Sequence, residues 1–197
     1  MLVLGFDAGN YAVKAVAAGN RIHFPSAVGT PSRASFSLRA DRGIVLRKPG
    51  PFLVGAEALL QSAFWQRPDG REWLASDGWY ALFCAAVAQA TDLQNVTAKV
   101  VAGLPCLFHE RDKGLVRQRL LGEHRIEVEG RRPQVIRVED CRVIKQPQGA
   151  VLSEALDEFE DANQYKLEYL VTKHGDRETI ARLRAIAAGT AAAAGEE

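Results

Sequence analysis

Two Gly-Asn pairs divide the first 25 residues into three short stretches in which apolar residues dominate or alternate with polar ones. An apolar run bounded by an acidic residue and a glycine is typical of a buried strand, and Gly-Asn is a strong signal for a tight turn. Strands are therefore predicted at residues 2–6, 11–18 and 21–24. Three strands joined by tight turns predict an antiparallel meander.

Strand-like and helix-like patterns alternate through the rest of the chain. Residues 79–90 are apolar nearly all round, which predicts a buried helix, and Gly122 supplies the expected end of a helix over residues 107–121. The other helices are predicted at residues 56–64, 150–161 and 178–188, and the other strands at 43–47, 52–55, 97–104, 123–128, 135–138, 141–145 and 166–172.

Three segments depart from this regular alternation. Residues 25–57 begin with a stretch rich in Ser, Pro, Gly and Arg, which predicts a small inserted subdomain. Residues 130–133 predict the exposed basic tip of a hairpin, and residues 187–197 are an alanine-rich stretch of low complexity.

The composition excludes several classes of function. The 197 residues suffice for one or two domains, and 25 Lys+Arg against 24 Asp+Glu exclude a protein that binds nucleic acid mainly through a basic surface. The three cysteines and four histidines lack the spacing of a disulfide framework or a metal site. No basic region precedes the first apolar run, and no apolar stretch reaches the roughly 20 residues of a membrane span. The sequence therefore predicts a cytoplasmic location.

The segment FDAGNYAVK at residues 6–14 carries the sharpest candidate chemistry. Asp7 at a strand end has the chemistry to hold a Mg²⁺-bound water, and the small residues Gly9 and Asn10 let backbone N–H groups approach phosphate oxygens. Lys14 would add a compact positive charge near those phosphates. The same pattern also fits an ordinary hairpin turn without a ligand.

Other polar and aromatic clusters favour structural roles. The tip residues Arg131 and Arg132 fit a solvated hairpin better than a nucleic-acid contact. The acidic residues between 154 and 161 lie on the exposed side of a predicted helix. The three tryptophans favour apolar packing over base stacking, and they are Trp65, Trp73 and Trp79.

Several motifs in a fixed order resemble the N-terminal domain of bacterial and archaeal actin-like ATPases of the plasmid-segregation (ParM/StbA) type. The resemblance covers roughly residues 1–162. It rests on FDAGNYAVK at 6–14, FPSAVG at 24–29, FLVGAEA at 52–58, VAGLP at 101–105, LLGEHRIEV at 120–128 and PQG at 147–149.

The resemblance implies a fold class and a set of site residues. The fold would be an α/β domain of the actin/Hsp70/sugar-kinase (ribonuclease H-like) class, with a mixed sheet and a small inserted subdomain. The cofactors would be Mg²⁺ and ATP, with Asp7 near the metal through water and Gly9, Asn10 and Lys14 at the phosphates. Gln148 would orient the attacking water by positioning, because a neutral amide takes no proton at neutral pH. Its alternative is a solvated residue at the start of a helix.

The sequence departs from the family pattern after residue 162. Residues 166–176 take the place of the strand and acidic-glycine turn that form the second phosphate loop in the family, but they lack that turn unless residues 174–176 are its remnant. A single phosphate loop leaves the phosphates largely in water, so weak ATP binding and little or no hydrolysis are expected. The chain is expected to be the N-terminal half of such a protein, and residues 163–197 a divergent tail.

Two functions remain open at this point. The first is a nucleotide-binding cytoskeletal protein that self-associates into filaments and works with a DNA-segregation adaptor, without direct binding to nucleic acid or membrane. The alternative is a non-catalytic actin-like module that binds a protein partner or filament. Half of a sugar or acid kinase fits the motifs less well.

Overall fold

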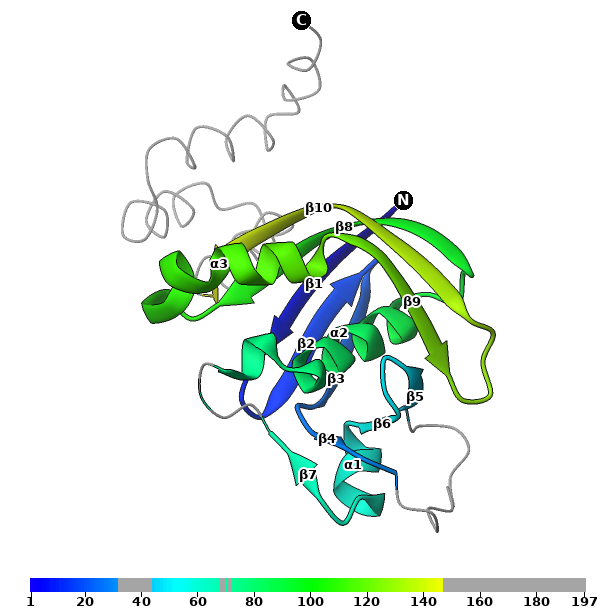
Figure 1. Cartoon of the computed structure of the whole chain (residues 1–197). Coiled ribbons are helices and arrows are strands. Elements are labelled where there is room, and N and C mark those ends of the chain that lie inside the picture. The colour runs from blue at the N-terminus through cyan, green and yellow to red at the C-terminus, as the bar shows by residue number, and fades with distance from the viewer. Residues whose placement is uncertain (32–43, 68–69, 71, 147–197) are drawn as a thin grey trace, which may run out of the picture. The chain divides into compact units, whose positions relative to one another are not determined.

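Strands from both halves of the described chain assemble into one mixed sheet (Figure 1). The computed structural model describes residues 1–31, 44–67, 70 and 72–146. Within these residues the sheet has ten strands in the order β3-β2-β1-β8-β10-β9-β5-β6-β4-β7. The strands are β1 (Leu2–Ala8), β2 (Ala12–Ala17), β3 (Asn20–Pro25), β4 (Val28–Gly29), β5 (Ile44–Lys48), β6 (Phe52–Val54), β7 (Trp65–Gln66), β8 (Asn95–Leu104), β9 (Gly122–Val128) and β10 (Gln134–Lys145).

The predicted N-terminal meander is confirmed. Strand β2 pairs antiparallel with both β1 and β3. Strand β8 runs parallel to β1 on one side and to β10 on the other. Because parallel strands point the same way, the carboxyl ends of β1, β8 and β10 meet at one edge of the sheet, where ligands commonly bind in α/β folds.

The buried helix predicted at residues 79–90 is α2 (Asp77–Ala90). All of its residues from Ala81 to Ala88 are buried, and Phe83 stands edge-on to Phe6 of β1 with ring centroids 5.5 Å apart. The helix starts at Ser76, whose hydroxyl accepts a hydrogen bond from the Trp79 N–H at 3.2 Å. This packing anchors α2 against the first strand of the sheet.

A second long helix, α3 (Cys106–Leu120), follows β8 directly. Val116 and Leu120 are buried in the same core as α2, and the Nε2 of His109 donates a hydrogen bond to the carbonyl oxygen of Val143 on β10 at 3.0 Å. Gly122 follows the helix with a φ of 106°, a conformation that favours glycine. The predicted helix end is therefore confirmed.

Two predictions differ from the structure by more than one or two residues at the end of an element. The helix predicted at residues 56–64 ends early, as α1 (Ala56–Gln61), because the Ser62 hydroxyl donates to the carbonyl oxygen of Phe64 at 2.7 Å and turns the chain into β7. The two strands predicted at 135–138 and 141–145 are one strand, β10, with a bulge between Val138 and Asp140.

The described residues contain one further helical element, and part of the sequence prediction falls outside them. A 3₁₀ helix, η1 (Glu72–Ala75), precedes α2, and Met1–Lys145 forms one compact unit. No helix in the described part of the chain has the length and apolar character needed to cross a membrane. The elements predicted beyond residue 149 and the domain boundary at 162 lie outside the described residues.

Candidate functional site

The turn between β1 and β2 brings together four of the five residues singled out from the sequence. Asp7 and Lys14 are opposite each other in the antiparallel register, so their side chains leave the same face of the sheet. The Gly9 N–H donates to the carbonyl oxygen of Ala12 at 3.1 Å and closes the turn. Asn10 and Tyr11 form its tip, and both are exposed.

Gly9 lies where a side chain would be crowded by the turn. A Cβ atom at this position would lie 3.2 Å from the carbonyl oxygen of Ala12, which is closer than ordinary van der Waals contact. The absence of a side chain also leaves the backbone of the turn open to a close approach by another molecule. The turn therefore combines an accessible backbone with one carboxylate and one ammonium group on the neighbouring strands.

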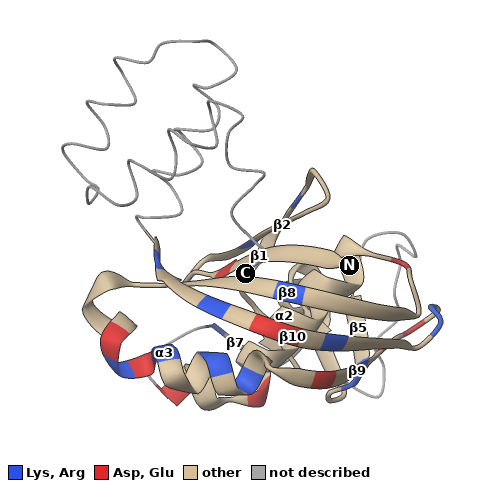
Figure 2. Ribbon diagram, turned by 90° about the horizontal axis from the view of Figure 1, so that it is seen from above, with Lys and Arg blue, Asp and Glu red and all other residues tan. Residues whose placement is uncertain are grey.

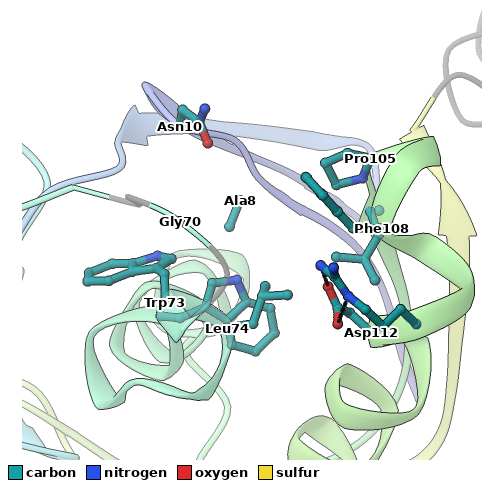
Figure 3. Close-up of a pocket in the computed structure, with 12 residues that line it drawn as sticks. Ala8, Asn10, Gly70, Trp73, Leu74, Pro105, Phe108 and Asp112 are labelled. Atoms are coloured by element: carbon teal, nitrogen blue, oxygen red, sulfur yellow. Dashed lines mark hydrogen bonds and ion pairs between the residues drawn. The ribbon is translucent and has the colours of Figure 1, made fainter.

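A pocket of about 190 Å³ lies beside this turn (Figure 3). Ala8 and Asn10 form its wall on the β1 side, and Gly103 and Leu104 belong to the carboxyl end of β8. The remaining lining residues come from the segment before α2, from α2 itself and from the start of α3, and they are Gly70, Trp73, Leu74, Trp79, Pro105, Phe108, Arg111 and Asp112. The pocket therefore opens where the parallel strands end.

An ion pair forms the polar wall of this pocket. The Nε and one Nη of Arg111 donate to the two carboxylate oxygens of Asp112, each at 2.9 Å, and the guanidinium lies 4.8 Å from the centre of the Phe108 ring. These hydrogen bonds raise the pKa of Arg111 above its usual value. Because the cation already has a buried carboxylate as its partner, it offers little net charge to a ligand.

The other candidate residues are Arg131 and Arg132 at the basic tip and Gln148. Arg131 donates to the carbonyl oxygen of Ala88 at 2.7 Å, which ties the basic tip to the end of α2, while Arg132 is exposed. Gln148 lies outside the described residues.

The described residues contain no group of three or more His, Cys, Asp or Glu that could hold a metal ion. A carboxylate such as that of Asp7, together with phosphate oxygens and water, is a donor set that Mg²⁺ commonly uses.

Sequence reasoning missed an aromatic and cationic cluster at the same turn. The Arg67 guanidinium lies 5.6 Å from the centre of the Tyr11 ring and 5.0 Å from that of the Trp65 ring. Trp73 and Trp79 are buried, as expected, but Trp65 is 42% exposed and was wrongly assigned to apolar packing. Tyr11 lies more than 50 positions before Trp65 and Arg67 in the sequence, so no local pattern predicts that they meet.

A meander followed by two parallel strands, with helices in the crossover connections, is the arrangement of strands expected of the actin-like fold class. The chain belongs to the family of the actin-like protein N-terminal domain, whose model matches residues 5–149. This confirms the resemblance and the α/β fold class predicted from the sequence.

Solved structures agree with the family assignment. An archaeal actin homologue, Ta0583, in complex with ADP aligns with a TM-score of 0.65 and 20% identity, over 81% of this chain and 48% of that chain. The apo ParM protein of pSK41 aligns with a TM-score of 0.64 and 18% identity, over 77% and 51%. The Alp12 filament structure aligns with a TM-score of 0.59 and 16% identity, over 77% and 48%.

These similarities establish the fold and leave the activity to be proposed. The chain spans about half the length of the solved structures that it matches. Among curated proteins, no sequence matches this chain.

Proposed function

We propose that this chain carries the first phosphate-binding turn of an actin-like nucleotide-binding protein that assembles into filaments. The observation that carries the proposal is the register of Asp7 opposite Lys14 on the two strands that flank the Gly9-Asn10 turn. One carboxylate for a Mg²⁺-bound water, one ammonium group and an open backbone turn are the groups that a Mg²⁺–nucleotide phosphate needs. The ADP complex of the archaeal homologue supports adenine nucleotide as the ligand class.

Asp7 and Lys14 would bind phosphate in different ways because their charges are opposite. Asp7 repels phosphate unless a cation lies between them, so its contribution depends on Mg²⁺. Lys14 is exposed on β2 and attracts phosphate with or without the metal. When bound, Mg²⁺ would neutralise phosphate charge. A single turn surrounds the phosphates on one side, so we expect weak binding by this chain alone.

The test compares the affinity for ATP of the whole chain and of its Asp7→Asn variant, by titration calorimetry up to millimolar ATP. We expect Asp7→Asn to weaken binding at least about tenfold with Mg²⁺, equivalent to about 1.4 kcal/mol, and to have no such effect in EDTA. Glu139→Gln, at the exposed bulge of β10, is the matched control and should bind as the unaltered chain does. Equal binding by the Asp7→Asn variant and the unaltered chain in Mg²⁺ would exclude the proposed metal role.

Hydrolysis is assigned to Gln148 by the family resemblance. A glutamine that positions water acts on the chemical step and leaves ground-state binding alone. The single phosphate loop leaves little turnover, and we expect Gln148→Ala to reduce whatever turnover the chain has at least about tenfold, with little change in the dissociation constant for ATP. Gln146→Ala should change neither quantity. Release of phosphate under saturating ATP measures the turnover, and calorimetry measures the dissociation constant. A parallel loss of affinity and turnover would contradict a positioning role.

Filament formation is proposed from the Alp12 filament among the matching structures. ATP-dependent light scattering in Mg²⁺, followed by sedimentation, tests it directly. Assembly with a DNA-segregation adaptor in the cytoplasm would follow from the same family resemblance, and co-sedimentation of the filament with a candidate adaptor tests that step.

A second function is favoured by exposed apolar side chains on α3. Leu107 is 83% exposed and Leu115 is 40% exposed. Such side chains suit a non-catalytic actin-like module that binds a protein partner or filament, such as a second copy of this chain. Self-association without ATP that is lost in Leu107→Glu, in a chain that does not bind ATP, would favour this function over the first.

A further inference from the structure

Arg67 contacts the candidate phosphate-binding turn through aromatic rings alone. Its guanidinium lies over Tyr11, at the tip of the turn, and over Trp65 of β7, with the distances given above. Contacts of this kind fix the plane of a guanidinium, and they also remove part of the water around it. The cation is therefore held beside the turn in a restricted orientation.

One hydrogen-bond donor of Arg67 has no acceptor within the described residues. Its Nε is buried without a hydrogen-bond partner there, and the guanidinium forms no ion pair with any described carboxylate. A buried donor without an acceptor costs about 1–3 kcal/mol, so an acceptor supplied by a ligand or by water would stabilise this arrangement. Arg111, the other arginine near the turn, differs because Asp112 already neutralises it.

Backbone contacts fix Arg67 relative to the turn. The Ser26 N–H donates to the carbonyl oxygen of Tyr11 at 3.0 Å, and two residues later Val28 pairs with Gln66 in the β4–β7 ladder. The short segment from 26 to 28 thus connects the tip of the turn to the residue before Arg67. A side chain placed by the backbone on both sides is suited to orient a ligand.

We propose that Arg67 is a phosphate-binding residue, whose guanidinium donates to an oxyanion of the nucleotide bound at the β1–β2 turn. This inference rests on the proposed function. A planar guanidinium matches two oxygens of one phosphate group, and partial removal of water strengthens the attraction between the two charges. The aromatic contacts to Tyr11 and Trp65 would hold the plane of the guanidinium in a fixed orientation toward the phosphate oxygens.

The test measures the binding of three probes, Mg²⁺–ATP, tripolyphosphate and adenosine, to the full chain by titration calorimetry. We expect Arg67→Met to weaken binding of ATP and tripolyphosphate at least about tenfold and to leave adenosine unchanged. Arg67→Lys keeps the charge but loses the paired donors. Its affinity for ATP and tripolyphosphate should therefore lie between that of Arg67→Met and that of the unaltered chain. Arg21→Met is the matched control, because Arg21 is exposed at the opposite end of the β2–β3 ladder from the turn.

The outcomes separate this inference from the proposed function. If the unaltered chain and Arg67→Met bind ATP and tripolyphosphate equally, Arg67 is not a phosphate-binding residue, whereas the proposed function stands. If the unaltered chain binds neither probe, both fail together. If Arg67→Met unfolds, as judged by circular dichroism, Arg67→Lys decides: affinity for both phosphate probes equal to that of the unaltered chain overturns the inference, and a selective loss for them supports it.

Discussion

His124 is buried between two hydrogen-bond partners that together fix its tautomer. Its Nε2 donates to the carbonyl oxygen of Leu120 at 2.8 Å, so its Nδ1 accepts from the Tyr80 hydroxyl at 2.7 Å. Burial raises the pKa of Tyr80, which keeps that hydroxyl protonated as the donor. The ring is thus a neutral imidazole with both nitrogens satisfied, and protonation of Nδ1 would remove the acceptor of the Tyr80 hydroxyl proton.

A pH dependence of stability follows from this arrangement. Burial lowers the pKa of His124 below its ordinary value of 6.5. The unfolded chain therefore binds a proton before the folded chain does, and the contribution of neutral His124 is complete above about pH 6.5 and is lost as the pH falls toward the lowered pKa. Each unit of pKa difference is worth about 1.4 kcal/mol.

The matched variants for this prediction are His124→Gln and His23→Gln. Glutamine retains a donor and an acceptor without titrating. We therefore expect the free energy of unfolding of His124→Gln to fall less than that of the unaltered chain between about pH 7 and 5. His23 is exposed on β3, so its variant should follow the profile of the unaltered chain. Urea unfolding at several pH values measures both. Identical pH profiles for His124→Gln and the unaltered chain would contradict the prediction.

At the residue scale, a site formed within one hairpin could be predicted, but a contact between distant segments could not. The spacing of Asp7, Gly9 and Lys14 places all three at one turn because adjacent strands pair in a fixed register. Arg67 reaches the same turn through the pairing of β4 with β7. That pairing joins two-residue strands, which carry almost no sequence signal.

At the scale of an element, α2 and α3 each contain a glycine in a different environment. A Cβ atom at Gly78 in α2 would lie 2.5 Å from Cη2 of the buried Trp73, whereas one at Gly114 in α3 would meet no atom within 4 Å. Alanine favours a helix over glycine by about 1 kcal/mol, but overpacking costs about 1–3 kcal/mol. The same substitution should therefore have opposite effects in the two helices.

We expect Gly78→Ala to lower the free energy of unfolding by about 1 kcal/mol or more, and Gly114→Ala to raise it by about 0.5–1 kcal/mol. Thermal and urea unfolding of the two variants beside the unaltered chain measure these shifts. Stabilisation by Gly78→Ala would mean that Trp73 moves aside at little cost.

Helices and long strands could be predicted from the sequence because their patterns extend over many residues. The apolar character of α2 and the β-branched residues of β8 are examples. The end of α1 depends on hydrogen bonds from a single serine, Ser62, to main-chain groups of Phe64 and Thr30. The continuity of β10 across its bulge depends on pairing with β8. Such features become visible only when distant segments meet.

At the scale of the whole molecule, Phe6 joins the sheet to α2. Its ring lies 5.6 Å from that of Trp79 and 5.5 Å from that of Phe83, edge-on to both. Val3 is on the same strand but is 54% exposed. The side chains of Phe6 and Val3 therefore lie on opposite faces of β1.

We expect Phe6→Ala to destabilise the molecule by about 3–5 kcal/mol, a large part of the 5–15 kcal/mol that holds a typical domain folded. Val3→Ala, the control on the other face, should change stability by less than about 0.5 kcal/mol. Urea unfolding followed by far-ultraviolet circular dichroism compares the two. Equal effects would mean that the core does not depend on the contact between Phe6 and α2.

The two outer strands of the sheet limit how copies of this chain can join. In the described part of the chain the edges are β3, which carries Arg21 and ends at Pro25, and the two-residue β7 (Figure 2 shows the charges along the strands). Charge, proline and short length all discourage an additional strand from pairing with an edge. Contacts between copies through the described residues are therefore favoured through complementary side-chain surfaces, and subunits joined in that way would separate more readily than the strands of amyloid-like, hydrogen-bonded ribbons.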